Sequence, residues 1–137
     1  MNHHKLGTRS LSRLRGVHPD LVKIVKRAIK ISSIDFTVLE GRRTLTRQKV
    51  LKASGASKTL RSRHLTGHAV DLAPWANGGI DWHDYAKFCQ VGHAMRVAAM
   101  DYGYEITWGA GKMYGGAWSN SFNDMPHFQL SWRRYPR

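Results

Sequence analysis

The decapeptide SRHLTGHAVD, residues 62–71, contains two side chains that bind metals well, His64 and Asp71. An extended chain would separate these two residues by roughly 23 Å at ~3.3 Å per residue. Ligands of one zinc ion lie only ~2.0–2.2 Å from it, so the chain must fold back if both residues are to bind. Gly67 suits such a bend best, because glycine adopts positive φ angles at little steric cost. We therefore expect a sharp turn at Gly67.

The segment after the turn, residues 69–73 with the sequence AVDLA, predicts a short buried strand that Pro74 closes. Side chains alternate along a strand, so Val70 and Leu72 share one face while Asp71 lies on the other between two alanines. A carboxylate in such surroundings needs a cation or several hydrogen bonds. A metal ligand is one interpretation of Asp71, and a cap or turn residue is the other.

A second histidine occurs near the far end of the chain, in the sequence DMPHFQL of residues 124–130. The alternation of Phe128 and Leu130 predicts a strand with His127 at its start and Asp124 in the preceding loop. Two histidines and one carboxylate leave one position of a tetrahedral zinc ion open, which is typical of catalytic rather than structural sites. Asp124 is then placed to act as a base on a water activated by zinc.

The pattern Ser-x-His-x-x-Gly-x-Ala-x-Asp, followed late by an acidic residue three positions before a histidine, resembles the zinc peptidases of bacterial cell-wall metabolism. These include D-alanyl-D-alanine dipeptidases and carboxypeptidases. The resemblance is closest to single-domain phage endolysins that act as L-alanyl-D-glutamate peptidases. It extends from about Pro19 to Leu130 and includes residues 36–44 (FTVLEGRRT) and 77–82 (NGGIDW).

The resemblance implies one zinc ion per chain with three ligands: His64, Asp71 and His127. It makes Asp124 the catalytic carboxylate and Arg43 the arginine that contacts substrate and oxyanion. Ser62 matches a substrate-binding position. The carboxypeptidase branch commonly has Glu where this chain has Asp124, which favours the endolysin branch.

The implied activity is hydrolysis of the L-Ala–D-Glu bond in peptidoglycan stem peptides, leading to host lysis. Removal of terminal D-alanine by a D,D-carboxypeptidase is the alternative within the same class, because the sequence leaves the cleaved bond open. It also leaves open the host range and any regulatory second ion.

Composition favours polyanionic partners. The 137 residues predict one domain spanning 1–137, with 22 Lys and Arg against 9 Asp and Glu and a formal charge of +13. Nucleic acid, anionic lipid and the cell wall all fit this charge. A nucleic-acid-binding module is the alternative from another class, but the sequence lacks zinc-finger pairs, an RRM aromatic signature and basic heptads. The single Cys89 excludes an internal disulfide, and we expect a monomer.

No apolar run follows the first residues, and no stretch approaches the ~18 apolar residues of a membrane span. We therefore expect no secretory signal. The chain would accumulate in the host cytoplasm and reach the cell wall after a holin opens the membrane.

Periodicity elsewhere predicts three helices and several short strands, so we expect an α+β fold. With the resemblance, we expect the strands to form a small, mainly antiparallel sheet with the zinc cleft at its edge. The resemblance implies a hedgehog/D,D-peptidase-like fold. Helices are expected from Pro19, from Thr44 or Thr46 to about Ala53, and from an Asp81 cap to Tyr102. Strands are expected at 36–39, 69–73, 104–108 and about 127–130. Residues 1–16 are expected to form a basic arm with at most a short helical turn. Residues 131–137 are expected to form a basic aromatic tail, which docks on an anionic envelope or frays.

The long third helix is predicted to bury Tyr85, Phe88, Cys89, Gly92, Met95, Ala99 and Tyr102. The loop at 109–123, with Tyr114 and Trp118, is expected to shape the cleft. His68 follows His64 at the spacing of a helical zinc pair, but the following strand argues against a helix there. His68 is therefore left out of the metal site.

Overall fold

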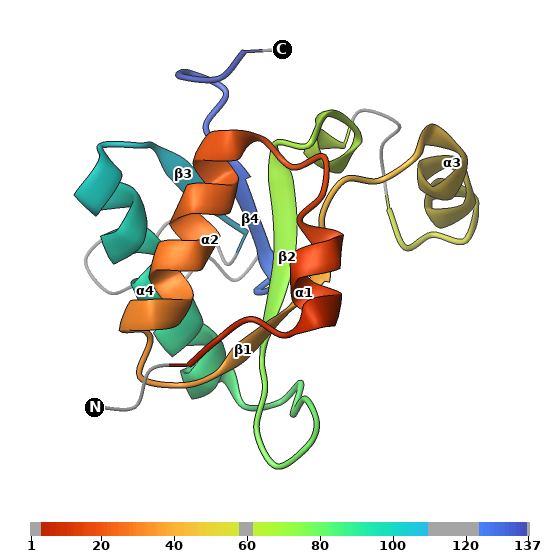
Figure 1. The fold of residues 1–137 in the computed structure, drawn as a ribbon. Helices are drawn as coiled ribbons and strands as arrows, with labels where there is room; N and C mark the ends of the chain where they lie inside the picture. The colour runs from red at the N-terminus through yellow and green to blue at the C-terminus, as the bar shows by residue number, and fades with distance from the viewer. Residues whose placement is uncertain (1–3, 58–61, 110–123, 137) are drawn as a thin grey trace.

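The computed structural model describes residues 4–57, 62–109 and 124–136. Its elements follow in the order α1 (Thr8–Arg13), α2 (Pro19–Ile31), β1 (Phe36–Glu40), α3 (Leu45–Ala53), the 3₁₀-helix η1 (Arg63–Thr66), β2 (Ala69–Pro74), α4 (Tyr85–Tyr102), β3 (Ile106–Trp108) and β4 (His127–Leu130). The four strands form one antiparallel sheet in the order β1-β2-β4-β3 (Figure 1). This confirms the expected α+β class.

The hydrophobic core lies between the sheet and the adjacent helices α2 and α4 (Figure 1). The central strands contribute Val70 and Leu72 from β2 and Phe128 and Leu130 from β4, all fully buried. Because side chains alternate along a strand, the residues between them project toward the opposite face of the sheet. That face carries the functional site.

Helix α2 begins and faces the core as its sequence predicts. Pro19 occupies the first turn, and the His18 ring accepts a hydrogen bond from the Asp20 backbone N–H at 3.1 Å. The buried stripe consists of Leu21, Ile24, Val25, Ala28 and Ile29. Exposed cations cover the other side: Lys23, Lys26, Arg27 and Lys30. The hydrophobic periodicity thus identified both faces correctly.

Helix α1 lies where a basic arm was expected, so the described chain has four α-helices instead of three. Ser10 is buried, and its hydroxyl accepts from the Val38 N–H at 3.0 Å and contacts the Thr37 hydroxyl at 3.1 Å. Arg13 donates to the Val38 carbonyl at 2.9 Å. These contacts pair backbone groups of the outer strand β1 that would otherwise face water. Residues 8–13 are therefore part of the fold.

Helix α4 begins later than predicted, because Asp84 and not Asp81 is the N-cap. The expected burial of Tyr85 and Tyr102 is wrong: they lie at the two helix ends and are 61% and 45% exposed. The buried side consists of Phe88, Val91, Gly92, Ala94, Met95, Ala98 and Ala99. Cys89 is half-buried beside this stripe, and burial raises the pKa of its thiol. A packing role for Cys89 agrees with both observations.

Helix α3 projects from the body of the molecule (Figure 1). Thr44 caps it by accepting from the Arg47 N–H at 3.1 Å, as predicted. Its apolar Leu45 and Val50 are about half exposed, whereas its polar Gln48 is completely buried. This inversion of the usual pattern indicates that α3 serves a polar contact rather than the core.

No helix in the described part of the chain is long and apolar enough to cross a membrane.

Candidate metal centre

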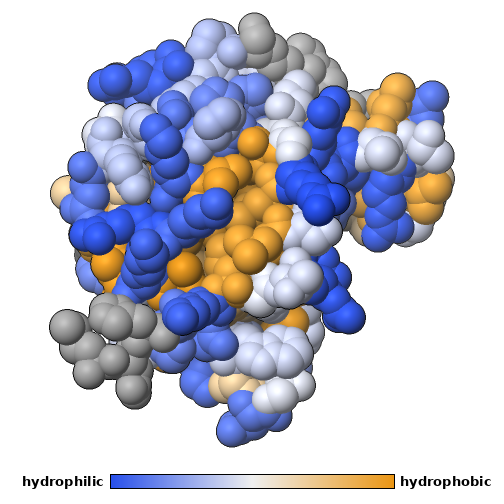
Figure 2. Space-filling view, in the orientation of Figure 1, coloured by the Kyte–Doolittle hydropathy of each residue, from blue (hydrophilic) through white to orange (hydrophobic). Residues whose placement is uncertain are grey.

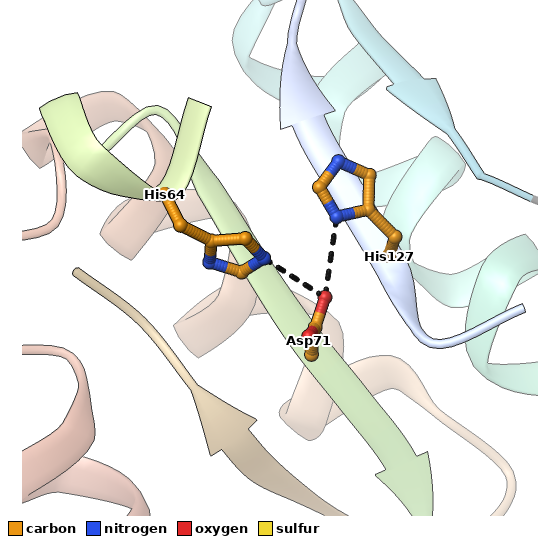
Figure 3. Close-up of side chains that lie close together, drawn as sticks. All are labelled: His64, Asp71 and His127. Carbon is orange, nitrogen blue, oxygen red and sulfur yellow. Dashed lines mark hydrogen bonds and ion pairs between the residues drawn. The ribbon is translucent and has the colours of Figure 1, made fainter. Parts of the chain in front are cut away.

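Three side chains from separate elements converge on one point: His64 from η1, Asp71 from β2 and His127 from β4 (Figure 3). Asp71 Oδ1 lies 3.1 Å from His64 Nε2 and 3.2 Å from His127 Nδ1. One ligand atom from each residue lies within 4.8 Å of the others. Ligand atoms around a tetrahedral zinc ion are about 3.4 Å apart, given bonds of ~2.1 Å. The cluster therefore has the dimensions of a zinc site.

The turn between His64 and Asp71 is built on Gly67, as the sequence predicts. Gly67 has φ 77° and ends η1. A Cβ atom at this position would clash with the Gly16 carbonyl oxygen, so the close approach of the two segments also requires glycine. The Gly67 carbonyl accepts from the His18 N–H at 2.8 Å, which ties the turn to the start of α2.

The other two members of the cluster are neighbours in the sheet. Asp71 is paired with His127 across β2 and β4, and with Glu40 across β1 and β2. The site therefore lies over the two central strands, on the face away from α2 and α4. The sheet edge was the expected position; side-chain alternation within β2 and β4 explains the difference, because it directs both residues out of one face.

Each histidine uses its second ring nitrogen to donate a hydrogen bond. His64 Nδ1 lies 2.8 Å from the Gly41 carbonyl oxygen, which can only accept, so Nδ1 carries the proton. His127 Nε2 lies 2.9 Å from the Gln129 amide oxygen and donates in the same way. In the neutral rings, His64 Nε2 and His127 Nδ1 therefore point their lone pairs at Asp71. Such orientation by a second acceptor is characteristic of metal-binding histidines.

Two lone pairs and a carboxylate repel one another unless protons or a cation lie between them. Burial opposes charge on Asp71, but its hydrogen bonds with His127 and His64 hold the pKa of the carboxyl well below its usual range. Burial likewise opposes charge on His127, yet contacts with Asp71 and Gln129 raise the pKa of its ring. The cluster thus attracts positive charge strongly, and two imidazoles with one carboxylate suit zinc. The residues present fit a bound zinc ion.

The cluster lines a cleft of about 410 Å³ that Arg43, Ser62 and Asp124 also line. The Asp124 backbone carbonyl accepts from the His127 N–H at 3.1 Å. Desolvation raises the pKa of the Asp124 carboxyl; His127 opposes this effect and the nearby Asp71 charge reinforces it. A carboxyl with a raised pKa beside a water-activating centre is suited to proton transfer.

Arg43 is held rigidly in the wall of the cleft. Its Nε and Nη2 donate to the two carboxylate oxygens of Glu40 at 2.6 and 2.9 Å, and its Nη1 donates to the Gln48 amide oxygen at 2.6 Å. The Arg43 backbone N–H donates to the His64 carbonyl at 2.9 Å. Gln48 in turn donates to the Ser57 hydroxyl at 2.8 Å, which explains why α3 buries a glutamine.

Sequence reasoning did not identify four supporting residues: Glu40, Gly41, Gln48 and Gln129. Only Gln129 had a usable signal, because it lies two positions after His127 and therefore shares its strand face. Ser62 lines the cleft, but its hydroxyl accepts from the His64 N–H at 3.2 Å and starts η1. His68 lies outside the cluster and contacts the Thr66 hydroxyl at 2.7 Å. Tyr114 and Trp118 lie outside the described residues.

Two imidazoles and a carboxylate that can hold a metal, with a further carboxyl and a guanidinium in the same cleft, are typical of hydrolases that activate water. The chain belongs to the phage L-alanyl-D-glutamate peptidase family, whose sequence model matches residues 2–131. The expectation of a peptidase from this family is thereby confirmed.

Two curated relatives carry the name L-alanyl-D-glutamate peptidase. That of Escherichia phage T5 is 38% identical over 109 residues, covering 77% of this chain and 80% of the relative. That of Listeria phage A118 is 33% identical over 104 residues, covering 76% of this chain but only 33% of the relative. The crystal structure of the Serratia marcescens L-Ala D-Glu endopeptidase ChiX is 40% identical, with TM-score 0.85 over 98% of this chain and 96% of that one.

Proposed function

We propose that this protein is a zinc-dependent peptidoglycan hydrolase that cleaves the L-Ala–D-Glu bond of stem peptides and lyses the host. The observation that carries the proposal is the convergence of His64 Nε2 and His127 Nδ1 on Asp71, each ring oriented by a second acceptor. The choice of the L-Ala–D-Glu bond as the one cleaved rests on the names of the two phage relatives and of the Serratia structure.

His64, Asp71 and His127 would hold the zinc ion and leave a coordination position open toward the cleft. Bound zinc supplies Lewis acidity, which lowers the pKa of water toward ~7 and polarises a carbonyl group.

The protein's own groups move the proton and stabilise charge. Asp124 accepts the proton of the attacking water and returns it to the amine that leaves with D-glutamate. Arg43 donates to the carbonyl oxygen of L-alanine as negative charge develops there. Among described residues, Glu40 and Gln48 take three of its N–H groups, and a guanidinium has five, which leaves donors for substrate.

Mass spectrometry of purified peptidoglycan digested by the zinc-loaded protein tests this function. Cleavage between L-Ala and D-Glu creates a new amino group on D-glutamate and leaves L-alanine on the glycan strand. A D,D-carboxypeptidase would instead release free D-alanine. A nucleic-acid-binding module would release no amine, and either of these results would overturn the proposal.

Delivery and docking complete the proposed function. We infer that a monomer accumulates in the host cytoplasm and reaches the wall after a holin opens the membrane, with its cationic surface resting on the anionic envelope.

Figure 2 shows an apolar strip over α1 and α2 bordered by hydrophilic side chains. A groove there has apolar walls, including Leu6 and Leu11, and a cationic rim that includes Lys26 and Lys30. This combination suits an anionic amphiphilic surface.

Vesicle sedimentation tests the docking surface. Lys26→Glu with Lys30→Glu should weaken binding to phosphatidylglycerol vesicles more than the matched α3 pair Lys49→Glu with Lys52→Glu. Equal weakening by both pairs would mean that only net charge matters.

A further inference from the structure

Trp132 stands on the wall of the catalytic cleft. It follows β4 by two residues, is 48% exposed, and lines the same cleft as Arg43, Asp124 and the metal-binding cluster. Two other exposed tryptophans, Trp75 and Trp82, do not line this cleft. Single exposed aromatic residues are ordinary on protein surfaces, but one at the wall of a polar cleft offers a binding face to what enters it.

The orientation of the Trp132 ring is set by the protein. The Arg63 guanidinium lies 3.9 Å from the ring centroid, and Arg63 is only 3% exposed. Arg63 Nη2 donates to the carbonyls of Leu130 and Tyr135 at 3.0 and 2.8 Å. A cation against an aromatic face is stabilising. The cation here, Arg63, directly precedes His64 in the chain. Trp132 therefore forms a rigid aromatic wall tied to the segment that carries His64.

The sheet register gives the cleft two chemically different flanks. Asp71 is paired with Glu40 on β1 and with His127 on β4, so these two residues lie on opposite sides of it. The β1 flank carries Arg43, bound to Glu40. The β4 flank continues to Trp132. One flank therefore presents the remaining N–H donors of a guanidinium that is already paired with Glu40, and the other presents an aromatic face.

The substrate of the proposed function is also asymmetric about the scissile bond. The D-glutamate side bears a free carboxylate, which can accept from an Arg43 N–H group that Glu40, Gln48 and the L-alanine carbonyl leave available. The L-alanine side is joined through a lactyl group to N-acetylmuramic acid, so a pyranose ring lies about one residue, ~3.3 Å of chain plus the lactyl link, beyond the scissile bond. The C–H face of a pyranose is apolar and weakly positive, which matches the electron-rich face of an indole.

We propose that Trp132 is a sugar-stacking residue that receives the muramyl ring on the L-alanine side, making the enzyme selective for glycan-linked stem peptides over free ones. This inference rests on the proposed function. It assigns Trp132 to substrate specificity, and it places the glycan strand along the β4 flank of the cleft.

The test compares cleavage of N-acetylmuramyl-pentapeptide with cleavage of the same pentapeptide lacking the sugar. The wild-type protein should prefer the muramyl substrate by up to about tenfold in kcat/KM, mainly through KM, as expected for loss of one stacking contact. Trp132→Ala should bring this ratio close to one, and Trp132→Phe should retain part of it. Trp75→Ala, the matched control at an exposed tryptophan outside the cleft, should keep the wild-type ratio.

Equal cleavage of both substrates by the wild-type protein would overturn the inference, and so would an unchanged preference in Trp132→Ala. If the alanine variant loses zinc or its helical circular dichroism, Trp132→Leu decides in the same assay, since it keeps apolar volume without an aromatic face and should also lose the preference. Failure of the zinc-loaded wild-type protein to cleave either substrate would instead refute the proposed function.

Discussion

Asp71 and His127 face each other across the β2–β4 ladder, with Oδ1 of the aspartate 3.2 Å from Nδ1 of the histidine. Directly opposed residues of an antiparallel pair have Cβ atoms only ~4.5–5.5 Å apart, so the sheet itself holds these two groups at a fixed spacing. His64 reaches them because the chain reverses at Gly67, whose φ of 77° suits glycine. Two residues of the candidate metal centre are therefore held by the central strands of the sheet, and the third by the turn at Gly67.

The hydrogen bond between Gln129 and His127 should control zinc affinity. Gln129→Leu removes the acceptor at 2.9 Å that keeps the proton on Nε2 and the lone pair on Nδ1. Loss of such an outer partner typically costs 10–100-fold in metal affinity. Competition with a chromogenic chelator measures the change. The exposed Gln90→Leu on α4 serves as the control, and unchanged affinity in Gln129→Leu would refute the orienting role.

Asp124→Asn should separate catalysis from metal binding. The substitution leaves the backbone carbonyl of residue 124, which accepts from the His127 N–H, so zinc should be retained. The new side-chain amide cannot take a proton, so the rate should fall by ~10²–10⁴-fold. Asp124→Glu should keep part of the activity, because the related carboxypeptidases commonly have glutamate there. The assay pairs elemental analysis with amine release from peptidoglycan. An Asn variant that arrives without zinc would make Asp124 a ligand or a support for His127.

Arg43 and its partners should affect turnover without affecting zinc. Arg43→Ala removes the donor proposed for the developing oxyanion, a change worth ~10²–10³-fold in kcat at comparable sites. Gln48→Leu should give a smaller loss, because Glu40 still holds two of the three anchored nitrogens. Arg42→Ala is the matched control at the exposed neighbouring arginine. Equal effects of Arg42→Ala and Arg43→Ala would contradict the assignment.

The basic aromatic tail should contribute to stability through Tyr135. Its hydroxyl donates to Asp20 Oδ2 at 2.8 Å, so the described part of this segment docks on α2. Desolvation and this hydrogen bond raise the pKa of Tyr135 from 10.0 to about 12. Because the pKa is higher in the folded state, the stabilisation is complete below about pH 10 and is lost as the pH rises through about 12.

Thermal denaturation across this pH range checks the prediction. Tyr135→Phe should lower stability by roughly 1 kcal/mol at neutral pH. The difference from wild type should shrink above pH 10.0 and close as the pH rises through about 12. The exposed Tyr102→Phe should change nothing. A neutral-pH melting temperature equal to wild type in Tyr135→Phe would indicate a frayed tail.

The sequence predicted the elements whose pattern is local. Helix α2 and strands β2 and β4 have strong periodicity, and Gly67 marks the turn between two metal-binding side chains. Helix α1 was expected to be no more than a short turn in a basic arm, because it has only six residues and depends on contacts such as Ser10 with Thr37, 27 positions away. Asp81 and Asp84 are equally good caps by sequence alone, so the start of α4 was placed too early.

The supporting shell of the site was less predictable than its ligands. Gln48 reaches Arg43 across the turn that leads into α3, and no periodicity encodes that contact. The Gly41 carbonyl acts through its position opposite His64, 23 residues away, and carries no side-chain signal. Residues that orient other residues need the three-dimensional arrangement to be recognised.

Zinc content tests the central claim most directly. Elemental analysis of the purified protein should find one zinc ion per chain, and His64→Ala, Asp71→Ala and His127→Ala should each lose zinc together with amine release from peptidoglycan. His68→Ala is the matched histidine control and should keep both. Chelation should abolish activity, and added zinc should restore it. Full activity in protein shown to be free of metal would contradict the account.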